Sequence, residues 1–267
     1  MQPMIEIIKN KDFNEISNIE YGFFTRKGGF STGEFDSLNV NSSKINGELK
    51  ENVEKNLNLI KKYFNSPYSV LKLKQVHSNK VYVFDDLSIL PSYAQIEADS
   101  IITKIKYLII GVSTSDCVPI LLSDEKNEII SAIHAGWRSA IAGIIENTIN
   151  EMVKIGANIN EIKALIGPHL RVENFEVQKD FIKILKENNV DDSAFIVKKD
   201  DKLFFNITNF VKNILKKQGV NYVYDVNLDT YTNPELFFSY RRSCHEKKDK
   251  FGCQFSTIML KKPHVYR

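Results

Sequence analysis

Cysteine is scarce in this chain of 267 residues, which has three. An odd number of cysteines in a chain of this length does not form the disulfide framework of a small secreted domain, and it suits a reducing compartment. Long apolar runs are also missing: the longest, such as residues 107–112, fall far below the roughly 20 residues of a membrane-spanning helix. No basic segment followed by an apolar one opens the chain, so the sequence predicts a cytoplasmic protein without a secretory signal.

Neither sign of charge is in clear excess, since 36 Lys and Arg residues face 33 Asp and Glu residues and the net charge is +3. With no dense basic face along the chain, charge gives no support to nucleic-acid binding. A content of 43% hydrophobic and 26% charged residues is ordinary for globular proteins and excludes disorder, collagen and coiled coil. Internal repeats and Pro- or Ser-rich linkers are absent, so residues 1–267 are predicted to form a single domain.

Arginine is rare beside lysine, with 6 residues against 30. A guanidinium offers a planar fork for carboxylate or phosphate that an ammonium group cannot match, so the few arginines are expected where lysine would not serve. Arg26, Arg138 and Arg241 lie beside turns and are the candidates for binding substrate or phosphate. The alternative is that some of them pair with structural carboxylates.

The pattern of apolar residues predicts both strands and helices. Short β-branched runs bounded by turn residues predict strands at residues 81–84, 107–112, 118–122, 128–133, 162–166, 222–226 and 256–260. Helical spacing predicts helices around residues 53–64, 141–152, 181–185 and 211–215. Because the strands come in clusters rather than alternating with helices, an α+β fold with a mixed or antiparallel sheet is favoured. The nucleotide-binding patterns GxGxxG and GxxxxGK(S/T) are absent.

Polar residues that can bind a metal or act as nucleophile or base gather beside the predicted strands. Three interpretations of His77, Cys117 and His134 are open. They can be ligands of one zinc ion, because two imidazoles and a thiolate fill three tetrahedral positions and leave the fourth for water. Cys117 can instead be a nucleophile with a histidine as its base. In the third interpretation, Cys117 is a small core residue and the histidines are structural. Separations of 40 and 17 residues do not decide between them.

Taken together, the motifs resemble those of the YfiH-like, laccase-domain family, whose members are described as polyphenol oxidases, purine nucleoside phosphorylases and peptidoglycan editing factors. The resemblance runs through nearly the whole chain, and its most specific part is the pair of motifs DCxP and HAGWR. The segments that carry it, in the family's order, are residues 24–31 (FTRKGGFS), 37–39 (SLN), 74–77 (KQVH), 97–100 (EADS), 115–119 (SDCVP), 134–138 (HAGWR), 166–168 (IGP) and 238–242 (FSYRR).

The resemblance implies a single-domain layered α/β/β/α sandwich with mixed sheets, and a zinc site whose ligands are His77, Cys117 and His134. It implies phosphorolysis of adenosine, inosine and methylthioadenosine, together with adenosine deamination. Copper-linked phenol oxidation, also credited to the family, is disfavoured because multi-copper catalysis needs many histidine ligands and this chain has five histidines. Leu57 and Cys253 stand where the family usually has arginine, which concerns substrate binding more than the metal.

The predicted function is therefore that of a zinc-dependent purine nucleoside phosphorylase and adenosine deaminase, with His77, Cys117 and His134 as catalytic and metal-binding residues. Its expected partners are a nucleoside and phosphate, and neither nucleic acid nor a membrane. One alternative is a hydrolase that edits peptidoglycan precursors, with Cys117 or activated water as the nucleophile. The other is a non-catalytic metal-binding protein, for which a fourth protein ligand is expected to close the site.

Overall fold

The computed structural model describes residues 4–41, 48–88 and 96–262. The strands are β1 (Ile7–Ile8), β2 (Ile19–Phe24), β3 (Val81–Phe84), β4 (Ser100–Thr103), β5 (Ile109–Thr114), β6 (Val118–Asp124), β7 (Ile129–Ala135), β8 (Ile162–Ile166), β9 (Glu176–Val177), β10 (Ile196–Lys199), β11 (Lys202–Phe205), β12 (Tyr222–Asp225) and β13 (Gln254–Leu260). The α-helices are α1 (Lys50–Phe64), α2 (Trp137–Ile141), α3 (Ile144–Lys154), α4 (Asp180–Glu187), α5 (Asp192–Phe195), α6 (Ile207–Lys217) and α7 (Tyr240–His245). No helix of these described residues is long and apolar enough to cross a membrane.

Two sheets stack face to face at the centre of the molecule. The first has the order β1-β2-β13-β5 and is antiparallel throughout. The second has the order β12-β8-β6-β7-β4-β3 and is mixed, because β12 pairs with β8 and β3 with β4 in parallel. On β6, Leu121 packs between the sheets whereas Ile120 and Leu122 pack toward the helices, since successive side chains of a strand point to opposite faces.

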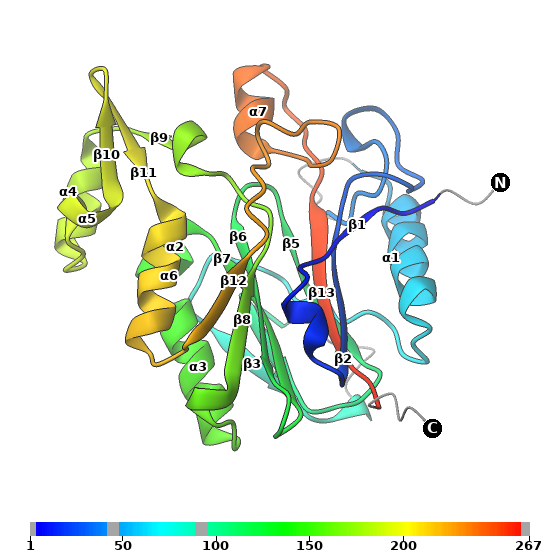
Figure 1. Cartoon of the computed structure of the whole chain (residues 1–267). Helices are drawn as coiled ribbons and strands as arrows, with labels where there is room; N and C mark the ends of the chain where they lie inside the picture. Colours follow the sequence, from blue (N-terminus) through cyan, green and yellow to red (C-terminus); the bar gives the residue numbers. More distant parts are fainter. Residues whose placement is uncertain (1–3, 42–47, 89–95, 263–267) are drawn as a thin grey trace.

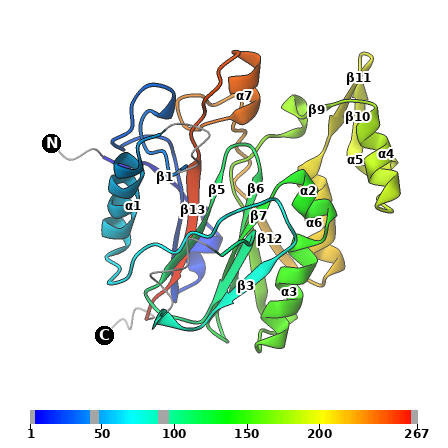
Figure 2. The same ribbon diagram turned by 180° about the vertical axis from the view of Figure 1, so that it is seen from behind.

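Helices cover the outer face of each sheet, as Figures 1 and 2 show. Helix α1 packs on the first sheet through Ile60 and Phe64, which contact Phe24 in one apolar cluster. Helices α3 and α6 pack on the second sheet and complete the core on that side. The α+β class and the α/β/β/α layers expected from the sequence are confirmed.

The predicted strands and helices all appear, with one difference in the helices. The apolar spacing across residues 141–152 predicts one helix, but the structure has α2 and α3 with a break at Ala142 and Gly143. Gly143 has φ +91°, a left-handed backbone that glycine adopts without steric cost and that ends the helical path.

The pattern of apolar residues did not predict two groups of strands, β2 with β4 and the hairpin β10–β11. In β2, Glu20 and Gly22 interrupt the apolar sequence, and the four residues of β4 begin and end with the hydroxyl residues Ser100 and Thr103. The hairpin β10–β11 carries lysines at both ends of its turn, so it lacks a continuous apolar face. With α4, α5 and β9 it forms a small projection, here called the flap (residues 176–205), which stands away from the layers in Figure 1.

Candidate metal centre

The second sheet and its neighbouring loops bring His77, Cys117 and His134 together. His77 lies in the loop before β3, Cys117 in the turn between β5 and β6, and His134 near the end of β7, beside β6. Their donor atoms all lie within 4.8 Å of one another. Sγ of Cys117 is 3.7 Å from Nε2 of His77, and the two imidazole centroids are 4.7 Å apart. Residues separated by 40 and 17 positions in the sequence thus form one cluster.

A strained backbone and a glycine make this approach feasible. His77 has φ +57° and Asp116 has φ +86°, values that are uncommon outside glycine and cost of order 1–3 kcal/mol each. A Cβ atom on Gly136 would lie 2.8 Å from Cδ2 of His77 and 3.1 Å from Sγ of Cys117. Only glycine at this position therefore leaves the donor atoms their present arrangement.

A buried carboxylate, Asp99, orients both histidines. Its Oδ1 lies 2.8 Å from Nδ1 of His134 and accepts the backbone N–H of His77 at 3.0 Å. Its Oδ2 accepts the backbone N–H and the hydroxyl of Ser78. Burial opposes ionisation of Asp99, but the hydrogen bonds and the charge of His134 hold its pKa below the usual value. With Nδ1 of His134 bonded to this carboxylate, Nε2 is directed toward the cluster.

The thiol of Cys117 and the imidazole of His134 shift each other's protonation. Burial opposes ionisation of the thiol, but the charge of His134 and hydrogen bonds to both histidines lower the pKa of Cys117 to about 6. Burial likewise opposes protonation of His134, whereas Cys117 and Asp99 raise its pKa to about 9. The protein groups by themselves thus favour a thiolate, which is the form that ligates metals and attacks electrophiles.

The chemistry of this donor set fits a metal ion. Two imidazole nitrogens and a thiolate are three of the ligands that zinc takes in tetrahedral sites, and Asp99 provides the outer hydrogen bond that metal-binding histidines usually have. Within the described residues, no fourth His, Cys, Asp or Glu joins the group. A three-ligand set is typical of catalytic sites and does not match the closed site expected of a metal-storing protein. Cys117 is partly exposed, which also disfavours its interpretation as a core residue.

A cavity of about 200 Å³ opens beside the cluster and presents aromatic and basic side chains. Trp137 follows directly on Gly136 and carries the guanidinium of Arg138 over its ring, 4.1 Å from the centroid. No carboxylate among the residues described in the structure forms an ion pair with Arg138. Arg241 lines the same cavity and donates from Nη1 to the carbonyl of Glu176 at 3.0 Å, so one of its arms is already engaged. This cavity is called the metal pocket below.

The third predicted arginine lies elsewhere. Nε and Nη1 of Arg26 donate to the backbone carbonyls of Asp36 and Pro234, and its guanidinium lies 4.5 Å from the ring centroid of Phe238. It lines a different cavity, which shares only helix α7 with the metal pocket. The structure therefore brings Arg138 and Arg241 to the metal cluster and leaves Arg26 apart from it.

From the sequence no role was assigned to Asp99 or to Phe175, an aromatic wall of the pocket, and Tyr240, another wall, entered only as part of the segment FSYRR. The available signal for Asp99 was its place in the segment EADS (residues 97–100), one of those that carry the family resemblance. The two departures from the family pattern have a common location: Leu57 and Cys253 belong to one apolar cluster between α1 and the first sheet. Both residues thus pack among apolar side chains, at sequence positions where the family usually has arginine.

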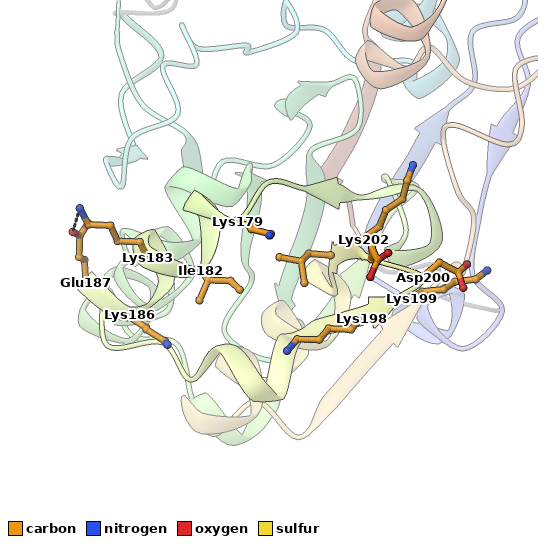
Figure 3. Close-up of a pocket in the computed structure, with 11 residues that line it drawn as sticks. Lys179, Ile182, Lys183, Lys186, Glu187, Lys198, Lys199, Asp200 and Lys202 are labelled. Atoms are coloured by element: carbon orange, nitrogen blue, oxygen red, sulfur yellow. Dashed lines mark ion pairs between the residues drawn. The ribbon is translucent and has the colours of Figure 1, made fainter.

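A cavity larger than the metal pocket lies away from the metal cluster. A cleft of about 1080 Å³, the flap cleft, lies between α4 and the hairpin β10–β11 (Figure 3). Three of its six lysines form ion pairs: Lys183 lies 3.7 Å from Glu187, Lys186 3.8 Å from Asp192 and Lys202 2.9 Å from Glu176. Neither histidine nor cysteine lines it, so it lacks the donors and nucleophiles that the metal pocket has.

A sequence model of the family described as multi-copper polyphenol oxidoreductase laccase matches residues 20–261. The chain belongs to this family. It is 34% identical over 234 residues to a purine nucleoside phosphorylase of Rickettsia conorii, covering 85% of this chain and 95% of that one. It is 30% identical to the purine nucleoside phosphorylase YfiH of Escherichia coli, covering 82% and 86% of the two chains.

Two further likenesses bear on activity and fold. Over 47% of this chain and 50% of the relative, the sequence is 33% identical to the adenosine deaminase RL5 of an unknown prokaryotic organism. The crystal structure of a Neisseria meningitidis protein of the DUF152 family superimposes with a TM-score of 0.79 at 27% identity, covering 98% of this chain and 100% of that one. The resemblance to YfiH-like proteins stated from the motifs is confirmed.

Proposed function

We propose that this chain is a zinc-dependent purine nucleoside phosphorylase that splits adenosine, inosine or methylthioadenosine into the free base and ribose 1-phosphate, and that it also deaminates adenosine. The observation that carries the proposal is the cluster of His77, Cys117 and His134 beside a pocket that presents the unpaired guanidinium of Arg138. The names of the relatives, nucleoside phosphorylases and an adenosine deaminase, support the substrate class.

His77, Cys117 and His134 are the residues that would hold the zinc ion. Bound zinc supplies Lewis acidity, which makes water a nucleophile near neutral pH. Asp99 keeps the ring of His134 in its orientation through Nδ1, and Gly136 preserves the space beside the donors. Zinc is favoured over copper because a mixed thiolate and imidazole set of three suits a single tetrahedral ion, whereas multi-copper chemistry needs more histidines than this chain has.

The walls of the metal pocket suit a purine nucleoside. Trp137, Phe175 and Tyr240 offer ring faces on which a flat purine can stack. In phosphorolysis a phosphate oxygen bonds to the ribose carbon while the base leaves with the electrons of the glycosidic bond. The phosphate needs a cation beside it, and Arg138 is the candidate because its planar fork binds two phosphate oxygens and no carboxylate of the described residues competes for it.

Pocket size separates this proposal from hydrolysis of a cell-wall precursor. A cavity of about 200 Å³ is below the roughly 300–1,000 Å³ of sites that enclose drug-sized ligands. A precursor built from a sugar and a peptide is larger than a nucleoside and would extend well outside it. The nucleoside is therefore the better match for the volume.

Product analysis on adenosine tests the proposed function. With zinc-loaded protein and no phosphate, the expected product is inosine; added phosphate should divert adenosine to adenine and ribose 1-phosphate, because phosphate attacks the sugar while water attacks the base. Arg138→Lys should weaken phosphorolysis roughly tenfold more than deamination, since charge is kept and the bidentate geometry is lost. Free base formed equally fast without phosphate would mean hydrolysis. Turnover of muramyl precursors but of no nucleoside would establish the editing hydrolase instead.

A further inference from the structure

Helix α7 borders a second cavity that the proposed reaction does not use. This cavity, the α7 pocket, has a volume of about 230 Å³. Its charged lining consists of four basic side chains, Arg26, Arg242, Lys248 and Lys250, and two acidic ones, Glu34 and Glu246. Consecutive residues of α7 serve the two cavities, because Arg241 lines the metal pocket whereas Arg242 lines the α7 pocket. A ligand in either cavity therefore contacts the same short helix.

Backbone carbonyls, rather than carboxylates, hold the two guanidiniums of the α7 pocket in place. Arg26 donates to the carbonyls of Asp36 and Pro234. Arg242 donates from Nη1 to the carbonyls of Thr230 and Tyr231, and from Nη2 to that of Phe237. A carbonyl oxygen satisfies a donor without cancelling its charge. Nη2 of Arg26 and Nε of Arg242 have no hydrogen-bond acceptor within the described part of the chain, so donors remain for a ligand.

Two of the carboxylates whose charges reach these guanidiniums, Asp116 and Glu246, have partners of their own. Asp116 accepts the hydroxyl of Thr230 and the backbone N–H of Arg241, each at 2.6 Å. Glu246 pairs with Lys248 at 2.6 Å. Neither carboxylate lies within ion-pair distance of Arg26 or Arg242 in the described structure. Two half-buried positive charges thus face one small cavity without a direct counter-ion.

The pKa shifts of Arg26 and Arg242 are those expected of two positive charges that lie close together and partly buried. Burial and the positive charge of Arg242 lower the pKa of Arg26, although Asp36 and Glu246 oppose this shift. Burial also lowers the pKa of Arg242, although Asp116 and Glu246 oppose this shift. An anion between the two guanidiniums would relieve both the repulsion and the loss of hydration.

We propose that the α7 pocket binds a small oxyanion, either inorganic phosphate or the phosphate group of a phosphomonoester, at a site separate from the metal cluster. Guanidinium forks match the geometry of phosphate oxygens, and Phe238 supports the Arg26 fork from one side. Lys250 adds positive charge at the same cavity, whereas the charge of Lys248 is paired with Glu246. The inference goes beyond the proposed function, because it needs neither the metal nor a nucleoside.

Titration of the zinc-loaded protein with inorganic phosphate at constant ionic strength tests the site, with ribose 5-phosphate as a second arm. The amide signals of Ser243 and Gly252 report on the α7 pocket, and the fluorescence of Trp137, the single tryptophan, reports on the metal pocket. We expect saturable shifts of both amide signals. The arm that saturates at the lower concentration identifies the source of the phosphate group.

Three variants locate the binding. Arg26→Gln should raise the dissociation constant for phosphate at the amide signals roughly tenfold, the loss expected for a charge-assisted hydrogen bond. Lys250→Gln, an exposed change that leaves the fold intact, should raise it roughly two- to threefold. The matched control Arg138→Gln should change the Trp137 response and leave the amide shifts as they are. Absence of amide shifts at millimolar phosphate, or equal shifts in Arg26→Gln and Lys250→Gln, would overturn the proposal.

Discussion

The flap cleft is larger than the metal pocket, but the metal pocket is the one whose side chains are held in a fixed arrangement. The cleft has about 1080 Å³ and the metal pocket about 200 Å³. In the smaller cavity, the donors are fixed by a buried carboxylate, by strained backbone at His77 and by the space that Gly136 leaves. In the larger one, exposed lysines pair with exposed acids. The groups suited to metal binding therefore lie where buried side chains hold each other in place, and not in the larger of these two cavities.

The two regions also differ in what their charges contribute. Exposed ion pairs such as Lys183 with Glu187 contribute about 0–1 kcal/mol, and solvent and salt screen them. Asp99 and His134 are buried and bonded at 2.8 Å, so removing one partner leaves an uncompensated group in the interior. Substitutions in the metal pocket are thus expected to have large effects, and substitutions in the flap cleft small ones.

The largest effect is expected from Cys117→Ala. Purified protein should carry about one zinc ion per chain, and the variant should carry almost none, because two imidazoles remain of a three-ligand set. Metal analysis of the purified proteins measures this directly. Cys244→Ala is the matched control, since Cys244 is exposed and outside the cluster. Full zinc content in Cys117→Ala would remove the basis for treating the pocket as a metal centre.

Asp99→Asn comes next. It keeps the size of the side chain but removes the charge that faces Nδ1 of His134, so zinc affinity should fall roughly 10- to 100-fold. Competition with a chromophoric chelator gives the dissociation constant. Asp86→Asn, an exchange of the same kind at an exposed aspartate, should leave the constant unchanged. If the two variants bind zinc equally well, Asp99 does not organise the ligands.

The sequence predicted elements with a clear apolar periodicity, and it missed both the polar hairpin β10–β11 and the buried strands β2 and β4, whose apolar runs are short or broken. The spacing of Ile60 and Phe64 revealed α1 because one face of that helix is buried, whereas the polar hairpin β10–β11 shows no such signal. The helix break at Gly143 depends on a single left-handed residue and stayed invisible to periodicity.

The candidate site was predictable to the same limited degree. Motif resemblance selected His77, Cys117 and His134, and the structure brings them together. Which arginine faces them was not predictable, because the separation of Arg26 from the cluster arises from the packing of strands and loops far apart in the sequence. The role of Asp99 depends likewise on contacts that only the folded chain makes.

A third prediction concerns the wall of the metal pocket and its dependence on pH. His169 is fully buried; its Nδ1 donates to the carbonyl of Gly167 and its Nε2 accepts the hydroxyl of Thr208. The neighbouring residues Leu170 and Ile207 line the pocket. Burial, and to a smaller degree the charge of Arg171, lower the pKa of His169 to about 4. Between pH 6.5 and 4 the unfolded chain therefore binds a proton that the folded chain does not.

The free energy of unfolding should consequently fall as pH decreases from 6.5 to 4, with His169 contributing roughly 3 kcal/mol of the loss. His169→Gln should be less stable at pH 7 but should lose less stability over this interval. Urea unfolding at a series of pH values measures both quantities, and His245→Gln serves as the exposed control. Parallel curves for the wild type and His169→Gln would contradict the assignment of a neutral buried imidazole.

The smallest effect is expected in the flap cleft. The double variant Lys198→Gln and Lys199→Gln removes two of its lysines, both exposed, and neither lies at the metal pocket. Zinc content and kcat/KM for phosphorolysis should stay within about twofold of wild type, since exposed charges are screened over the distance of a Debye length. The pair Lys216→Gln and Lys217→Gln at the end of α6 makes the same change of charge away from the cleft. If only the flap variant loses activity, by as much as Arg138→Lys does, then the cleft takes part in binding substrate and the contrast between the two cavities fails.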